Sequence, residues 1–284
     1  NSVAAGAQSL FQLPTFVTGI FLIVIIAIPL LGGIQRIGNV VSYIVPIMAF
    51  IYILGMAVII GINYDKVGAA FYMIFSSAFS GQAATGGFLG AGVMAAIRFG
   101  VSRGVFSSEA GLGSSPIAAA AAKTDCPSKQ ALVSMSSVFI TTGIVCTLTG
   151  LIIAITGVLG QTDSNGALIT GTNLVINAFN SALPHSGIVI LISVIFFAYS
   201  TMLGWAYYGE KATEYLFGQR SIYYYRIIYI CLILPGAMLN LNIVWGIANI
   251  MNGLMAFPNL IGLLLMGGII AKETELFDCT LSPT

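Results

Sequence analysis

Seven long apolar stretches recur along this chain and constrain its fold more than any other feature. A helix that crosses a bilayer needs about 20 mostly apolar residues. The stretches that meet this requirement are 15–33, 40–62, 68–97, 131–159, 186–208, 224–243 and 248–270. Charged residues make up 7% of the chain, whereas a soluble domain carries about a quarter. The sequence therefore predicts an all-α integral membrane protein, with one transmembrane domain over residues 1–284.

The charged residues predict an orientation in the membrane. All nine acidic residues fall outside the seven stretches. If the first residues are outside the cell, nine of the ten Lys and Arg residues lie on the cytoplasmic side, counting Arg226 at the start of the stretch 224–243, and Lys66 is the exception. Cytoplasmic loops are enriched in Lys and Arg. We therefore expect a multi-pass protein of the plasma (cell inner) membrane, with its N-terminus and the loop 160–185 outside and a cytoplasmic tail at 271–284.

The connection over residues 98–130 is expected to be a cytoplasmic loop that contains a short helix. An alanine run at 118–122 follows Pro116, and proline is favoured in the first turn of a helix. Ser114 or Ser115 precedes this proline and can cap the helix with its hydroxyl.

A glycine-rich segment, SGQAATGGFLGAG at 80–92, interrupts the third apolar stretch. Each glycine costs a helix interior about 1 kcal/mol relative to alanine. A helix can open at membrane depth only where protein, a ligand, an ion or water replaces the lost hydrogen bonds. A glycine-interrupted membrane helix is a pointer to the binding site of a transporter. The competing explanation is a close crossing of two helices.

Hydroxyl groups gather at two further places. In FFAYSTMLGWAYYGEK (196–211), Ser200 and Thr201 lie near the middle of an apolar stretch, and Trp205 follows Thr201 by one helical turn on the same face. Hydroxyl oxygens can coordinate a hard cation, but they can also bond back to the helix backbone, and Trp205 can be an interfacial anchor. Helix packing is the favoured explanation for the second group, which is Ser134, Ser136, Ser137, Thr141 and Thr142.

The sequence contains no pattern that predicts an enzyme, a cofactor or a nucleic-acid partner. GLGSS lacks the lysine of a phosphate-binding loop, and no GxSxG or HExxH motif occurs. The four cysteines form no CxxC pair and His185 is the single histidine, so neither a structural metal nor a disulfide framework is expected. No Asp, Glu or His lies in an apolar stretch to relay protons. Coupling to Na⁺ through hydroxyl and carbonyl oxygens is the expected alternative.

Four segments resemble the alanine/glycine:cation symporter family, also called the sodium:alanine symporters, and they run through nearly the whole chain. The second and third are very specific to that family. The segments are LGGIQRIGNVVSYIVPIMAFIYILG (31–55), AATGGFLGAGVMAAIRFGVSRGVFSSEAGLGSSPIAAAAAKTD (83–125), FFAYSTMLGWAYYGEK (196–211) and FPNLIGLLLMGG (257–268).

The resemblance implies a leucine-transporter-like fold of the amino acid–polyamine–cation superfamily, built from two inverted five-helix repeats. The seven stretches would then match core helices 4 to 10. Residues 15–62 would be the last two helices of the first repeat, and residues 66–270 the complete second repeat. Because the chain starts at Asn1 and would lack core helices 1 to 3, we expect a C-terminal fragment of a longer protein.

The resemblance also implies roles for single residues. Ser200 and Thr201 match the hydroxyls of core helix 8 that bind Na⁺, and Trp205 matches the wall that limits the size of the substrate pocket. The unwound part of core helix 6, whose backbone faces the substrate, is matched by Gly81, Gln82, Thr85, Gly86 and Gly87.

The implied function is sodium-coupled symport of small neutral amino acids, alanine and glycine, by alternating access, with Na⁺ as the coupling ion and no other cofactor. The alternatives are a seven-helix receptor, which shares the helix number and topology, and a channel for small solutes. The sequence leaves open the preference among alanine, glycine and D-amino acids, the choice between Na⁺ and H⁺, and the oligomeric state.

Overall fold

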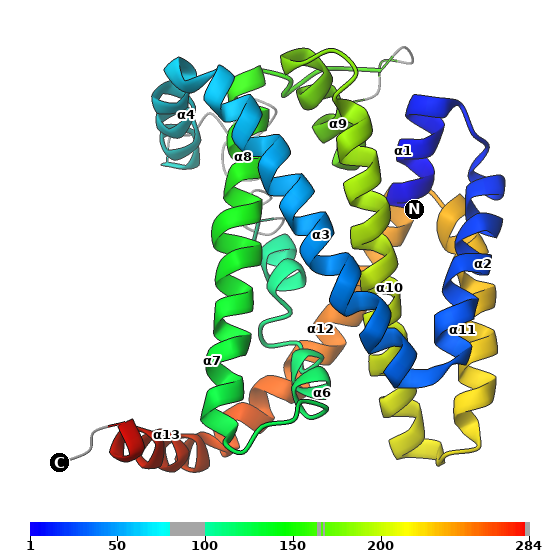
Figure 1. Cartoon of the computed structure of the whole chain (residues 1–284), viewed down its shortest axis with the longest axis vertical. Coiled ribbons are helices and arrows are strands. Elements are labelled where there is room, and N and C mark those ends of the chain that lie inside the picture. Colours follow the sequence, from blue (N-terminus) through cyan, green and yellow to red (C-terminus); the bar gives the residue numbers. More distant parts are fainter. Residues whose placement is uncertain (80–99, 164–165, 167, 282–284) are drawn as a thin grey trace. The chain divides into compact units, whose positions relative to one another are not determined.

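The structure is a computed structural model that describes residues 1–79, 100–163, 166 and 168–281 (Figure 1). Within these ranges every extended regular element is a helix, and an isolated antiparallel bridge pairs Thr162 with Leu168. The predicted all-α class is therefore confirmed. The chain divides into two compact units. One combines Asn1–Ser80 with Thr147–Val244, and the other combines Gly81–Cys146 with Trp245–Thr284.

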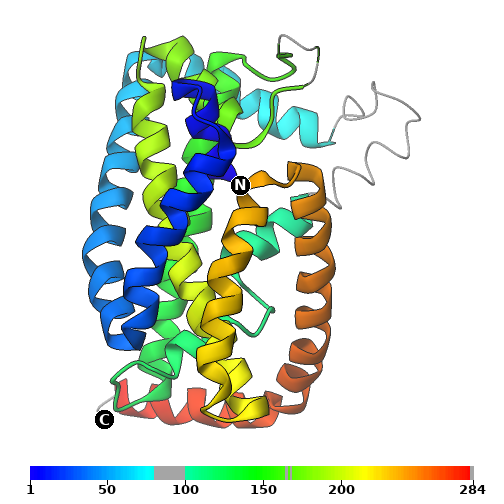
Figure 2. The same cartoon turned by 90° about the vertical axis from the view of Figure 1, so that its right-hand side faces the viewer.

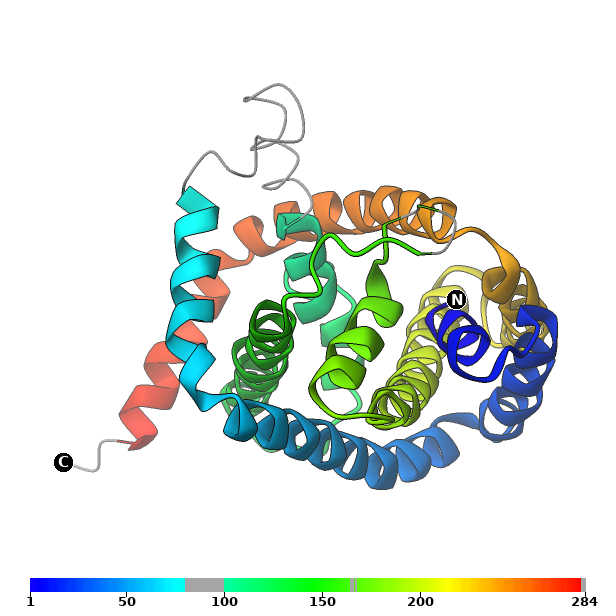
Figure 3. The same cartoon turned by 90° about the horizontal axis from the view of Figure 1, so that it is seen from above.

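The first unit is built around the long helix α10. Helix α10 contacts five other helices of this unit and lies among them when the unit is seen from above (Figure 3). Helices α2 and α11 pack side by side along their lengths (Figure 2). The elements of this unit are α1 (Ser2–Phe11), α2 (Thr15–Leu31), α3 (Gly33–Ile62), the 3-10 turn η1 (Tyr64–Lys66), α4 (Val67–Phe79), α8 (Thr147–Thr156), α9 (Gly171–Ala182), α10 (Gly187–Phe217) and α11 (Ser221–Met238).

Apolar side chains from α2, α3, α10 and α11 form the core of the first unit. Ile26 and Leu30 of α2, together with Leu203 and Ala206 of α10, are completely buried. Burying an apolar side chain of the size of leucine or isoleucine contributes roughly 1.5–3 kcal/mol. This core therefore fixes α10 against its neighbours.

The second unit contains shorter elements and one long helix. Residues 100–108 are helical and are followed by α6 (Ser115–Ala119), α7 (Pro127–Val138) and the π-helix η3 (Phe139–Cys146). The long helix α12 (Leu241–Leu265) lies almost wholly in this unit, and α13 (Gly267–Leu281) follows it after a sharp change of direction (Figure 2).

Five described helices are long and apolar enough to cross a membrane. They are Ile37–Ile62, Pro127–Thr156, Gly187–Phe217, Ser221–Met238 and Leu241–Leu265, while the apolar helix Thr15–Leu31 is shorter. These six helices fall on six of the seven predicted stretches. The seventh, 68–97, begins in α4 and continues into residues 80–97, which lie outside the described ranges.

The surfaces of α2 and α3 carry large exposed apolar side chains. Phe21, Ile28, Ile47 and Phe50 each expose more than half of their surface. A soluble monomer rarely shows contiguous apolar patches of this kind. The exposed faces fit a lipid environment and support a multi-pass membrane protein.

The structure places helices in two segments predicted as a loop and a tail, and it shifts two predicted helix boundaries. The loop 160–185 contains helix α9, because Ile176, Ala178 and Phe179 share a buried face. The tail 271–284 lies largely in α13. The stretches predicted at 224–243 and 248–270 are helices at 221–238 and 241–265, since the Asn240 side chain accepts a hydrogen bond from the backbone N–H of Asn242 and begins α12 there.

Helix α10 also continues beyond the predicted end at residue 208. It reaches Phe217 and therefore includes Glu210 and Glu214. Both carboxylates lie beyond residue 208, where the predicted apolar stretch ends. The carboxyl group of Glu210 is buried and paired with Arg226, so the helix can extend past this charge.

The short helix expected after Pro116 is present as α6, with the proline in its first turn. The expected serine cap is not made. Ser114 occupies the N-cap position, but its hydroxyl donates to Oε2 of Glu109 at 2.8 Å instead of accepting from the helix.

Candidate functional site

Ser200 lies on the buried side of α10, against α3. Its hydroxyl donates to the backbone oxygen of Phe197 at 3.0 Å and lies 3.9 Å from the sulfur of Met48. Backbone bonding by a serine hydroxyl is common in helices. In this structure the Ser200 hydroxyl is therefore already engaged.

Thr201 lies on a different side of the same helix and is exposed. Successive helical residues are separated by about 100° around the axis, so Ser200 and Thr201 do not point the same way. Within the described residues the Thr201 hydroxyl makes no hydrogen bond, and it does not bond back to α10. Of the two predicted cation ligands, Thr201 is the one whose oxygen is available to a ligand.

Trp205 follows Thr201 by one turn and is partly buried. Its ring meets the ring of Tyr208 edge-on, with 5.7 Å between the centroids. The structure therefore places the available hydroxyl of Thr201 and the indole of Trp205 on one face of α10, as the sequence predicts.

The predicted substrate residues Gly81, Gln82, Thr85, Gly86 and Gly87 lie outside the described ranges, between the end of α4 and residue 100. Their role stays a prediction.

A broken helix that the sequence did not predict lies in the second unit. Residues 100–108 are helical, and three residues of the following segment have positive φ: Glu109 at 53°, Gly111 at 79° and Gly113 at 78°. A positive φ is incompatible with a right-handed helix. The next helix, α6, begins at Ser115, so Glu109–Ser114 interrupts the helical backbone of 100–119, which is called the broken helix below.

Hydrogen bonds hold this interruption in shape. Asn259 of α12 donates to the backbone oxygen of Gly111 at 3.0 Å. A Cβ atom at Gly113 would lie 2.9 Å from the Asn259 side-chain oxygen, so any larger residue would have to displace that side chain. Ser114 is almost completely buried and donates to Glu109. These contacts replace hydrogen bonds that a continuous helix would make.

The interruption borders a cavity of about 730 Å³. Polar groups of the broken helix and of α12 contribute to its wall, and apolar side chains of α7 and η3 complete it. A volume of this size exceeds the space that a small amino acid needs, and a few convergent polar groups in an apolar wall are typical of a ligand site. The polar lining residues include Ser108, Glu109, Ser115, Ser134 and Asn259.

The hydroxyl-rich segment of the fourth apolar stretch departs from a regular α-helix. It contains the π-helix η3, and such segments occur frequently at functional sites. Thr141 bonds back to the oxygen of Ser137 at 3.0 Å, which fits the expected packing role. The hydroxyl oxygen of Thr142 is buried and has no hydrogen-bond partner among the described residues.

The signal that identifies the broken helix is present in the sequence. SSEAGLGSSP at 107–116 combines two glycines, a carboxylate and a proline. By hydropathy this segment belongs to a loop, because the apolar stretch ends at residue 97. The glycine-rich segment 80–92 lies inside that stretch. Hydropathy alone therefore favours 80–92 over 107–116 as the place where a helix is interrupted.

Comparison with known proteins identifies the family. The sodium:alanine symporter family matches residues 1–282 of the chain. The sodium/alanine symporter AgcS of Methanococcus maripaludis is 48% identical over 281 residues, which are 98% of this chain and 60% of that relative. The sodium/proton-dependent alanine carrier protein of Bacillus sp. PS3 is 32% identical, over 94% of this chain and 62% of that relative. A probable sodium/glutamine symporter of Bacillus subtilis, GlnT, is 31% identical, over 99% of this chain and 57% of that relative.

The chain spans about 60% of the length of the curated relatives it matches. The match to the family covers nearly every described element, including α10 and the broken helix at 100–119. This chain belongs to the sodium:alanine symporter family.

Proposed function

We propose that the protein is a secondary active transporter that couples uptake of small neutral amino acids, alanine and glycine, to Na⁺ by alternating access. The observation that carries the proposal is the exposed hydroxyl of Thr201, which has no hydrogen-bond partner in the described part of the chain and lies one turn from Trp205, in a chain of this family. A neutral oxygen suits Na⁺, a hard cation. An indole one turn away suits the wall of a small pocket.

The fold proposed for this function is the leucine-transporter-like inverted repeat, with residues 15–62 in the first repeat and residues 66–270 in the second. The glycine-rich sequence 80–92 within the third apolar stretch supports it, because transporters of this architecture bind substrate at discontinuous helices. We propose the cavity beside Glu109–Ser114 as a second candidate for the substrate site. The glycine segment 81–87 keeps its proposed role in substrate binding.

Labelled alanine uptake by cells that express the natural gene product tests the function. Uptake should require Na⁺ and should fall to background when choline replaces Na⁺. Uptake that survives this replacement but collapses with the proton gradient would favour H⁺ coupling, which the name of the Bacillus sp. PS3 relative includes. Uptake independent of both gradients would favour a channel.

The Thr201→Ala variant tests the cation ligand. Removing the hydroxyl should raise the Na⁺ concentration for half-maximal alanine uptake about tenfold, since a hydrogen bond or ligand contact to a charged group contributes about 1.5–3 kcal/mol. The Thr213→Ala variant is the matched control, because the Thr213 hydroxyl bonds back to Gly209 in the same helix. An unchanged Na⁺ requirement in Thr201→Ala would contradict the assignment.

A further inference from the structure

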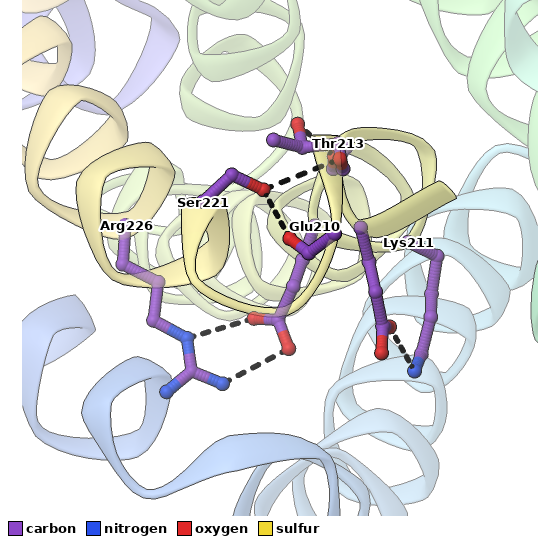
Figure 4. Close-up of polar contacts among 8 residues, drawn as sticks. Glu210, Lys211, Thr213, Ser221 and Arg226 are labelled. Atoms are coloured by element: carbon purple, nitrogen blue, oxygen red, sulfur yellow. Dashed lines mark hydrogen bonds and ion pairs between the residues drawn. The ribbon is translucent and has the colours of Figure 1, made fainter. Parts of the chain in front are cut away.

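Helices α10 and α11 are joined by a buried ion pair. Nε of Arg226 donates to Oε2 of Glu210 at 2.8 Å, and Nη2 of Arg226 donates to Oε1 at 2.9 Å (Figure 4). The Arg226 side chain exposes 17% of its surface and the Glu210 side chain 8%. Two parallel hydrogen bonds between a guanidinium and a carboxylate fix orientation as well as distance. The pair therefore sets how α10 is rotated relative to α11.

Two tyrosines extend this contact along the helices. The ring of Tyr225 lies so close to Gly209 that a Cβ atom there would overlap with it. The hydroxyl of Tyr229 donates to the backbone oxygen of Met202 at 2.7 Å. Both tyrosines and Arg226 lie on one face of α11, and their partners are spread along α10 from Met202 to Glu210. The two helices are thus joined over more than two turns.

This contact reaches the proposed cation ligand. Met202 directly follows Thr201, so Tyr229 holds the backbone next to that residue. On another side of α10, Ser200 packs against Met48 of α3. The segment 200–202 is therefore held by α3 and by α11, and Thr201 is the member that faces neither of these contacts.

Both carboxylate oxygens of Glu210 accept hydrogen bonds from Arg226. These two charge-assisted hydrogen bonds give the pair a mechanical role, because they resist rotation of α10 against α11.

We propose that Tyr229 and Arg226 of α11 are positioning residues for the cation site on α10, because they fix the rotation of α10 and so the direction of the Thr201 hydroxyl. The proposal rests on the proposed sodium-coupled function and adds α11 to the machinery of that site. In this proposal α10 and α11 move together as one rigid body during transport.

The Tyr229→Phe variant tests the hydrogen bond to Met202. Labelled alanine uptake is measured against Na⁺ concentration in cells that express the natural gene product, and the amount of transporter in the membrane is measured for each variant. We expect the Na⁺ concentration for half-maximal uptake to rise about three- to tenfold, as for the loss of one hydrogen bond. Maximal uptake per transporter should stay within about twofold of wild type, because Tyr229 touches neither ligand.

Tyr223→Phe is the matched control. Tyr223 lies on the same helix, exposes 63% of its surface and stacks edge-on with Tyr224, so this variant should leave the Na⁺ dependence unchanged. A purely structural role for Tyr229 would reduce the amount of transporter without moving the Na⁺ requirement. That result would overturn the proposal.

The Arg226→Lys variant tests the ion pair without leaving Glu210 unpaired. Lysine keeps the charge but cannot form the two parallel hydrogen bonds. We therefore expect the Na⁺ concentration for half-maximal uptake to rise, as in Tyr229→Phe. Lys211→Gln is the control, because it breaks the more exposed single contact to Glu214 within α10. If wild-type uptake does not depend on Na⁺, the proposed function fails. If it does, and neither Tyr229→Phe nor Arg226→Lys changes that dependence, only the positioning proposal fails.

Discussion

A proline inside α2 shows how single residues compensate for one another in this molecule. Pro29 has no backbone N–H, so the oxygen of Ile25 lacks its usual helical partner. Tyr199 of α10 donates its hydroxyl to that oxygen at 3.3 Å. An unpaired carbonyl is costly in a bilayer, and the tyrosine supplies the missing hydrogen bond from a neighbouring helix.

A double-mutant cycle measures this compensation. Tyr199→Phe should lower the stability of the wild type by about 1 kcal/mol. The same change should cost less in a Pro29→Ala background, because the substituted alanine restores the backbone N–H within α2. Thermal unfolding in detergent gives the four stabilities. An equal loss in both backgrounds would show that the hydroxyl does not act through Pro29.

The role proposed for Trp205 is also a property of one side chain. Replacing Trp205 with alanine should admit bulkier neutral amino acids, because the indole would no longer occupy the space beside Thr201. Competition of unlabelled leucine or glutamine against labelled alanine uptake measures this change. Trp205→Phe should keep most of the restriction, and a substrate range that stays confined to alanine and glycine in Trp205→Ala would contradict the pocket role.

Among the elements, the interruption between residue 108 and α6 depends on backbone geometry. Positive φ at Gly111 and Gly113, together with the close approach of Asn259, keeps this segment from continuing as a helix. The backbone conformation therefore favours glycine at both positions, and the nearby Asn259 side chain adds to this at Gly113.

Gly113→Ala tests this requirement. The substituted alanine would have to adopt a positive φ, and its methyl group would press on Asn259. We therefore expect alanine uptake to fall at least about tenfold, in line with a strain of roughly 1–3 kcal/mol. Gly104→Ala is the matched control, because Gly104 is helical and a Cβ there meets no atom within 4 Å. Full activity of Gly113→Ala would mean that the interruption does not support function.

For the molecule as a whole, the distribution of Lys and Arg predicts which loops face the cytoplasm. In a background whose own cysteines are replaced by serine, Asp65→Cys should react with a membrane-impermeant thiol reagent added to intact cells. Gln219→Cys, in the turn between α10 and α11, should react only after the membrane is permeabilised. Both positions are exposed, so the reverse pattern would invert the proposed orientation.

Apolar length and family-specific segments made much of the molecule predictable. Six of the seven apolar stretches coincide with described helices, because the bilayer demands long apolar helices whatever their neighbours are. The pairing of Thr201 with Trp205 was predictable for a similar reason, since the helical period alone brings them to one face.

Other features depended on contacts between distant segments. Helix α10 continues past residue 208, and Glu210 in this part pairs with Arg226 of another helix. Helix α9 forms in an apparent loop because one of its faces is buried. Neither the buried partner nor the buried face is visible in local hydropathy.

Composition and family segments are local properties of the chain, and they were enough to establish an all-α membrane protein of the sodium:alanine symporter family. The folded arrangement was needed to learn which hydroxyls are available, where a helical path is interrupted and how α11 holds α10. These features depend on which side chains meet across helices, and a hydrogen bond or an ion pair forms only when folding brings its two partners together.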